Sequence, residues 1–417
     1  MPAGHPASYL RLLRQNSNYR RFWFAGVVSQ VGDWFNYIAI FVLLTGLTGS
    51  GTSVSWYLIA KFIPTAILGP GSGILVDRLN RKAIMFGCDL LRVFVVLGYL
   101  FVRDGSQVWL VYVLALTQES IWTFSHLARQ STVPSICSME EINVANGLAG
   151  ASWSIMLAFG AALGGFVTAL YGWRAAICID SATFALSALL ISRVIIDHVP
   201  IARTSDLTWK KISGLEDFLE GVSYLYRHRK VVPLIFIKSG WALAGGGILV
   251  MLTVFGEQVF GEGGQGGRSG ILYSMRGLGA AIGPILAWRI FGDEERGMQW
   301  AIGLGFIVSA FFYLFFSRAP SLGLAAFFVF GAHCGGAVQW VFSTALLHRT
   351  IDPRFRGRVF AAEMALMTFF ISISTWSTGH ALDMGYAPRN IVMVLSVLFF
   401  VPGLLWSARL FLQGHKA

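Results

Sequence analysis

Apolar residues in this chain occur in long blocks, and twelve such blocks are separated by brief polar stretches. A block of about 20 apolar residues spans the hydrocarbon core of a bilayer. In lipid, backbone polar groups must bond to one another, which a helix achieves within one segment and a closed β-barrel achieves between neighbouring strands. The chain lacks the alternating pattern of barrel strands. The pattern therefore predicts an all-α membrane protein with twelve transmembrane helices, at about 22–47, 54–76, 82–102, 107–128, 143–169, 173–195, 231–256, 269–291, 298–317, 320–347, 357–380 and 390–412.

The longest polar stretch follows the sixth block and covers about 196–230. It is basic, and residues 214–226 within it place apolar side chains at helical spacing. We expect an amphipathic helix there, which either lies on the membrane surface or is a solvated linker helix. The stretch divides the chain into an N-terminal six-helix bundle, 1–195, a linker, 196–230, and a C-terminal six-helix bundle, 231–417.

The composition agrees with lipid as the solvent. Hydrophobic residues make up 55% of the chain and charged residues 13%, with a mean hydropathy of +0.63, whereas a soluble domain has about 25% charged residues. The cysteines and histidines show no metal-ligand spacing, and the sequence contains no phosphate-binding glycine loop. We therefore expect neither an enzyme nor a bound cofactor.

Lysine and arginine concentrate in every second loop and near both ends of the chain. The loops after the odd-numbered helices hold few of them. Because basic loops stay in the cytoplasm, both termini and the 196–230 linker are predicted to be cytoplasmic. The net charge of +11 then reflects topology and contact with anionic lipid, and it does not indicate nucleic-acid binding.

A charged stretch between the second and third blocks carries the most specific motif. Residues 73–82 read Gly-Ile-Leu-Val-Asp-Arg-Leu-Asn-Arg-Lys. The spacing Gly-x-x-x-Asp-Arg-x-x-Arg-Lys resembles the loop between helices 2 and 3 of the major facilitator superfamily of transporters. The resemblance implies twelve helices in two six-helix halves that work by alternating access.

The resemblance extends over nearly the whole chain. Segments 16–46, 145–148, 160–165 and 356–359 look like the bacterial branch that includes enterobactin and macrolide exporters. Segment 160–165 keeps the glycines of a pattern found in helix 5 of antiporters. The alternative reading of these glycines is close helix packing by small residues.

In that family the charged loop latches the cytoplasmic side. The resemblance implies that Asp77 caps the N-terminus of helix 11 near Gly357, where the partial positive charge of the helix favours a carboxylate. Gly73 would let a neighbouring helix approach, and the basic residues would pair with acids or lipid headgroups. The alternative is that these charges only set topology. The candidate gating residues are Gly73, Asp77, Arg78, Arg81, Lys82, Arg356 and Arg358.

Ionisable side chains inside the apolar blocks are further candidates, because charge is costly in hydrocarbon. Helices 1, 4, 7 and 10 line the central cavity in the resembled family, and each carries a polar or aromatic stripe here. Asp33 and Glu119 fall near the middle of their blocks, where burial suits a carboxyl to carry a proton. The candidate substrate-binding and proton-coupling residues are Gln30, Asp33, Tyr37, Glu119, Trp122, Lys238, Trp241, His333 and Trp340.

Each candidate also has a plainer reading. Asp33 would hold a structural hydrogen bond, Lys238 would neutralise a carboxylate such as Asp33, and His333 would be a satisfied core histidine. The three tryptophans would form an aromatic wall for the substrate or face lipid. Asp89 and Arg92, three residues apart, are expected to pair with each other or with nearby loops. Lys61 is expected to snorkel, and no role is assigned to Asp180, Arg276 and Glu363.

The sequence favours a secondary active transporter that exports an amphipathic small molecule, such as a drug or siderophore. Protons or another coupling ion would drive it. Two alternatives stay open: a transporter of lysophospholipid or other lipid, and a non-transporting membrane receptor on the same fold. We expect a monomer in the bacterial cytoplasmic (inner) membrane, in contact with membrane lipid.

Overall fold

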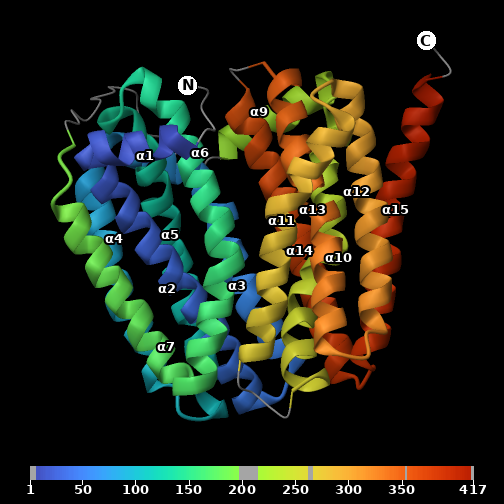
Figure 1. Ribbon diagram of the computed structural model, residues 1–417, viewed down its shortest axis with the longest axis horizontal. Coiled ribbons are helices and arrows are strands. Elements are labelled where there is room, and N and C mark those ends of the chain that lie inside the picture. Colours follow the sequence, from blue (N-terminus) through green and yellow to red (C-terminus); the bar gives the residue numbers. More distant parts are fainter. Residues whose placement is uncertain (1–5, 197–214, 262–265, 353–354, 415–417) are drawn as a thin grey trace.

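The computed structural model describes residues 6–196, 215–261, 266–352 and 355–414, and the regular structure in these ranges is helical (Figure 1). The first half of the chain contains α1 (Pro6–Gln15), α2 (Ser17–Thr48), α3 (Gly51–Arg78), α4 (Arg81–Gly98), η1 (Tyr99–Phe101), η2 (Gly105–Gln107), α5 (Val108–Ile136), α6 (Met139–Ile155), η3 (Met156–Gly160) and α7 (Ala161–Ser192). The second half contains α9 (Leu215–Arg227), α10 (Val232–Val254), η4 (Phe255–Val259), α11 (Gly267–Phe291), α12 (Glu295–Ser317), α13 (Leu322–Thr350), α14 (Arg356–Asp383) and α15 (Pro388–Gly414).

Each of the twelve predicted blocks falls on one helical pass. Within the described ranges, nine helical segments are long and apolar enough to cross a membrane. One of them, Met139–Ser192, is 54 residues long, and Gly172 divides it into two passes because its φ of 79° is not helical. α3 and α5, with 28 and 29 residues, pack among the other passes and complete the set. The predicted all-α membrane fold is confirmed.

Side-chain caps fix several helix starts. Asn16 accepts the Tyr19 N–H at 2.8 Å and begins α2. Ser138 and Glu141 form a reciprocal capping box at the start of α6. Such caps satisfy backbone N–H groups that have no partner within the helix. The short α1, which the sequence analysis did not predict, packs against α2 and α6.

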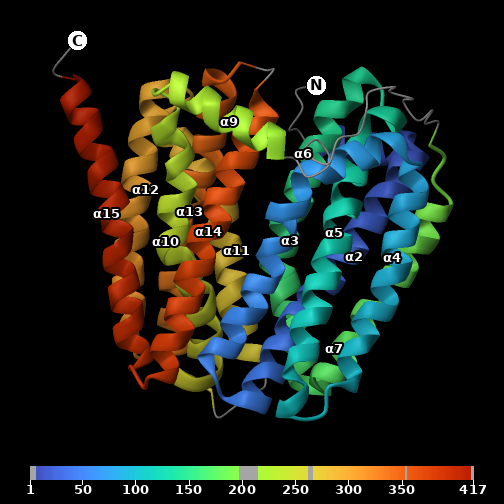
Figure 2. The same ribbon diagram turned by 180° about the vertical axis from the view of Figure 1, so that it is seen from behind.

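The helices form two bundles that stand side by side (Figures 1 and 2). α2 to α7 pack with one another, and so do α10 to α15. Contacts between the bundles are made chiefly by α3 on α14 and by α7 on α11. α1, α9 and the end of α15 lie at one end of the molecule, the upper end in Figure 1, which we call the terminal face. We call the other end the opposite face.

The predicted amphipathic helix of the linker is α9, and it lies across the terminal face of the second bundle (Figure 2). Its Glu220 forms an ion pair with Arg358 of α14 at 2.8 Å. The Tyr224 ring stacks on Phe355 with 4.7 Å between centroids. α9 is therefore attached to the start of α14.

Candidate functional site

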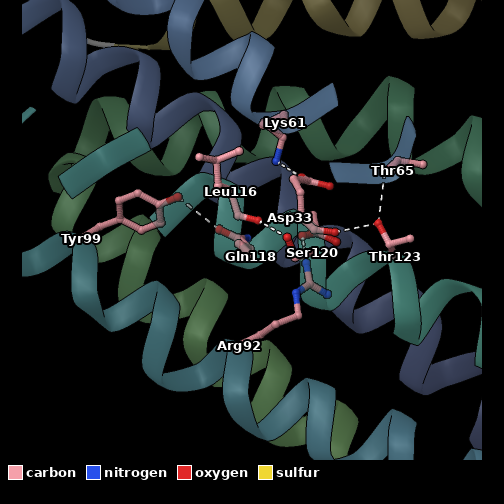
Figure 3. A network of polar contacts seen from close by, with 10 residues as sticks. Asp33, Lys61, Thr65, Arg92, Tyr99, Leu116, Gln118, Ser120 and Thr123 are labelled. Carbon is pink, nitrogen blue, oxygen red and sulfur yellow. Dashed lines mark hydrogen bonds and ion pairs between the residues drawn. The ribbon is translucent and has the colours of Figure 1, made fainter. Parts of the chain in front are cut away.

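An ion pair between Asp33 and Arg92 lies inside the N-terminal bundle (Figure 3). Asp33 is midway along α2, and its side chain is 26% exposed. Arg92 of α4 is 3% exposed, and its guanidinium carbon lies 3.8 Å from the centroid of the Phe184 ring on α7. Asp33 is therefore a partly exposed carboxylate paired with a buried cation.

A second ion pair joins Lys61 of α3 to Glu119 of α5 (Figure 3). The two side chains are 17% and 13% exposed. The Lys61 ammonium also lies 5.9 Å from the centroid of the Tyr37 ring and 5.8 Å from that of Tyr57. Lys61 does not snorkel as expected, because its ammonium turns inward to a carboxylate.

Asp180 is a third carboxyl in this region. It lies on the second pass of α7 and is fully buried, and neither of its oxygens accepts a hydrogen bond from any residue in the described ranges. Gly32 makes room for it, since a Cβ at that position would overlap the Asp180 carboxyl. The Asn36 amide lies beside it without a well-formed hydrogen bond. We call Asp33, Lys61, Arg92, Glu119 and Asp180 the charged cluster.

Asp89 and Arg92 do not pair with each other as expected. Asp89 forms an ion pair with Arg129 of α5 at 3.1 Å and accepts a hydrogen bond from the Ser187 hydroxyl at 2.6 Å. Arg92 is bound to Asp33 instead. Each side chain thus joins α4 to a different neighbouring helix.

Lys238 in the C-terminal bundle has a carboxylate partner, but the partner is not Asp33. Its ammonium lies 2.8 Å from Glu363 of α14, and both side chains are almost fully buried. The Trp340 ring covers this pair, with its centroid 4.7 Å from the ammonium. Lys238 and Glu363 balance each other's charge within one bundle.

His333 of α13 lies in a buried polar group of the same bundle. Its Nδ1 is 2.9 Å from the Tyr313 hydroxyl, and its Nε2 accepts a hydrogen bond from Arg276 Nε at 3.2 Å. Both ring nitrogens have partners, so the structure agrees with a satisfied core histidine. Arg276, to which the sequence assigned no role, positions the ring.

No ring-to-ring contact joins the three candidate tryptophans in the part of the chain that the structure describes. Trp122 stacks on His126 at 4.5 Å between centroids, Trp241 packs against Gly245, and Trp340 is 44% exposed beside Lys238. The aromatic contact between the bundles comes from other rings. Those rings, which we call the aromatic plug, are Trp34, Tyr37, Phe41, Tyr57 and Tyr273.

Tyr37 is the one sequence candidate in the aromatic plug. Its ring centroid is 5.4 Å from that of Tyr273 on α11, and the two hydroxyl oxygens are 3.4 Å apart. Tyr37 therefore touches the second bundle directly. Gln30, one turn before Asp33 on α2, has no hydrogen-bond partner for its Oε1 among the described residues.

The candidate gating residues lie at the terminal face. Gly73 and Asp77 are in α3, but the placement of the Asp77 side chain is outside the described part of the structure. Arg81 donates to the Ser131 carbonyl at 2.6 Å and so joins α4 to α5. Arg78 and Lys82 are both partly buried. Arg356 donates to the His348 carbonyl at 2.8 Å, and Arg358 pairs with Glu220.

Asp383, the last residue of α14, binds the start of α3 at the opposite face. Its carboxylate accepts the Gly51 N–H at 2.8 Å, the Thr52 N–H at 3.2 Å and the Ser50 hydroxyl at 2.8 Å. One turn deeper, the Ser55 hydroxyl donates to the Thr375 carbonyl at 2.8 Å. Among the described residues, the hydrogen bonds between the bundles run from mid-bundle to this face.

Glycines make the second contact between the bundles. A Cβ at Gly165 of α7 would lie 2.9 Å from the Cα of Gly270 on α11, and a Cβ at Gly270 would lie 2.7 Å from the Ala161 carbonyl oxygen. Gly160 and Gly164 pack in the same way against Trp34 of α2. The glycines of segment 160–165 therefore act in close helix packing, which was the alternative reading.

Sequence reasoning did not assign Lys61, Arg92, Asp180 or Glu363 to the site. Each is an ionisable residue inside an apolar block, which is the same signal that selected Asp33 and Glu119. The signal was present, but the partners depend on how each helix is rotated.

Comparisons with known proteins agree with this arrangement. The model of the Major Facilitator Superfamily matches residues 22–375. The putative bacilysin exporter BacE of Bacillus subtilis is 24% identical over 94% of each chain. Macrolide efflux protein A of Streptococcus pyogenes is 23% identical over 84% of this chain and 86% of that relative. One similar solved structure is a bacterial homolog of the human lysosomal transporter Spinster, described as inward-facing and unoccupied. It aligns with a TM-score of 0.74 and 13% identity, over 96% of this chain and 98% of that one. The chain belongs to the Major Facilitator Superfamily of transporters, as its sequence predicted.

Proposed function

We propose that this transporter exports an amphipathic small molecule from a bacterial cell in exchange for protons. The charged cluster is the observation that carries the proposal. It holds the carboxyls of Asp33, Glu119 and Asp180 but only two cations, Lys61 and Arg92, so its net charge is −3 + 2 = −1 when all five groups are ionised. Uncompensated charge is costly inside a membrane, and one proton removes it.

The names of two relatives support the direction of transport. One is called a bacilysin exporter and another a macrolide efflux protein. These names favour export over the lipid-transporter and receptor alternatives. They do not define one substrate, so the proposal is limited to a small molecule that can meet both aromatic rings and charged groups.

The terminal face is the cytoplasmic face in this proposal, because arginine and lysine gather there. The opposite face has few of them: Arg103, Arg174, Arg268, Arg318 and Arg389. The bundles hold together at that opposite face through Asp383 and the aromatic plug. The conformation is then inward-facing, and alternating access requires this contact to break.

The moving bodies in this scheme are the two bundles, 1–195 and 231–417. Residues 196–230 link them, and α9 stays with the second bundle through Arg358 and Phe355. The transporter works as a monomer, since one chain supplies both bundles.

Transport by purified protein in liposomes tests the proposal. A panel of labelled amphipathic compounds is offered with and without an imposed pH gradient, and a protonophore supplies the matched control. We expect at least one compound to accumulate against its gradient only while the pH gradient lasts. Accumulation that is the same after the protonophore contradicts proton coupling.

A further inference from the structure

Asp180 differs from the other buried carboxyls of the N-terminal bundle. Asp33 binds Arg92, Glu119 binds Lys61, and Asp89 binds Arg129. Asp180 is 0% exposed, and neither carboxyl oxygen has a hydrogen-bond partner in the described ranges. An ionised carboxylate without a partner at such a position costs several kcal/mol. A bound proton removes that cost.

The surroundings of Asp180 add to this cost. Its carboxyl lies against the backbone of α2 at Gly32, directly beside the residue that carries the Asp33 carboxylate. A like charge nearby disfavours a second ionised carboxyl. The ionisable groups that face this region from the packed helices are Asp33 on α2, Tyr57 and Lys61 on α3, Asp89 and Arg92 on α4, Tyr99 on η1, and Glu119 on α5.

Arg92 connects the two aspartates. It binds Asp33, and its guanidinium stacks on Phe184, which lies one helical turn after Asp180 on α7. Its Nε has no hydrogen-bond partner among the described residues. The guanidinium therefore lies against the stretch of α7 that carries Asp180, and its Nε–H is unpaired among the described residues.

We propose that Asp180 is the carboxyl that carries the transported proton, and that it shares Arg92 with Asp33. This inference rests on the proposed proton-coupled function. In the conformation described here, the proton is on Asp180 and Arg92 pairs with Asp33. The charged cluster is then neutral, with two ion pairs and one neutral acid.

Release of the proton changes the pairing. The O–H bond of Asp180 breaks, and the proton passes to water on the side of Asp33, whose side chain is partly exposed. The new carboxylate attracts Arg92, and Asp33 loses its cation. Asp33 is then a partly exposed carboxylate that can bind a cationic group of the substrate or take the next proton.

Infrared spectroscopy of the purified protein tests where the proton resides. We expect the C=O stretch of a protonated carboxylic acid near neutral pH in the wild type. The band should be lost in Asp180→Asn and kept in Glu363→Gln, a matched control whose carboxyl is also buried but is paired with Lys238. A band that persists in Asp180→Asn and disappears in Asp33→Asn or Glu119→Gln overturns the inference.

A measurement on the wild type covers the case in which Asp180→Asn does not fold. Carbon-13 labelling of aspartate alone should shift the band, since Glu119 remains unlabelled, and the shifted band should persist in Asp33→Asn. A band that does not shift, or no band at all, overturns the inference.

Transport separates this inference from the function on which it rests. We expect Asp180→Asn to keep exchange of labelled for unlabelled substrate and to lose accumulation driven by a pH gradient. If the wild type shows no proton-driven accumulation, the proposed function fails, while the infrared band still reports on Asp180. If the wild type and Asp180→Asn both accumulate substrate equally, the function stands and Asp180 is not the proton carrier.

Discussion

Asp383 accepts a hydrogen bond from the Gly51 N–H at 2.8 Å and so joins the end of α14 to the beginning of α3. These two helices have 28 residues each and run in opposite directions between the bundles. α3 also ends near an aspartate, Asp77, at the face where α14 begins with Arg356. In this conformation the Asp383 end of the two helices is joined by hydrogen bonds to Ser50, Gly51 and Thr52.

Asp383→Asn should weaken closure at the opposite face. The substitution removes the negative charge from a helix N-terminus, a contact worth about 1 kcal/mol when partly exposed, which corresponds to about a fivefold change in a two-state ratio. Distances between spin labels on the two bundles should shift toward the outward-open population. Asp104→Asn is the matched control, because Asp104 also lies at this face, and the side-chain bonds it makes with described residues stay within its own turn, to Ser106.

Asp77→Asn should have the reverse effect. If Asp77 caps the start of α14 when the cytoplasmic side is closed, its loss should reduce the outward-facing population by a similar factor of about five. Accessibility from the cytoplasmic side should rise and that from the other side should fall. Unchanged accessibility on both sides would mean that Asp77 sets only topology.

The Lys61–Glu119 ion pair should show strong coupling in a double-mutant cycle. Lys61→Met leaves Glu119 nearly buried without a cation, which should cost about 3 kcal/mol of stability. Lys61→Met combined with Glu119→Gln should recover most of this loss. Thermal unfolding in detergent measures the cycle, and additive losses would contradict the pairing.

A surface pair gives the control for that cycle. Arg349 and Asp293 are 2.7 Å apart, but their side chains are 44% and 66% exposed. Exposed pairs contribute about 0–1 kcal/mol, so this cycle should show little coupling.

Labelling of single cysteines should report the orientation. In a background without native cysteines, Ser205→Cys in the 196–230 linker should resist an impermeant reagent added outside intact cells. Ser106→Cys, at the opposite face, should react. If the native Cys137 is retained, it should interfere little, because burial and the nearby Glu141 raise the pKa of its thiol to about 12. Strong labelling at position 205 would reverse the orientation.

The sequence predicted the transmembrane helices well because lipid offers no hydrogen-bond partner to the backbone, so each apolar block must form a helix. Helical spacing also placed Asp33 and Tyr37 on one face of α2, and both lie in the region where charged and aromatic groups meet. Spacing along one helix does not specify which neighbouring helix faces it. Lys238 therefore received the wrong partner, since Glu363 lies 125 residues away in sequence and 2.8 Å away in space.

Gly165 of α7 and Gly270 of α11 bring the backbones of the two bundles into close contact. A Cβ at either glycine would overlap the facing helix, so α7 and α11 approach more closely there than larger side chains would allow. The Asp383 attachment lies away from this crossing and joins the end of α14 to the beginning of α3 at the opposite face. A bulky residue at position 165 or 270 would therefore push α7 and α11 apart while removing no group from the Asp383 contact.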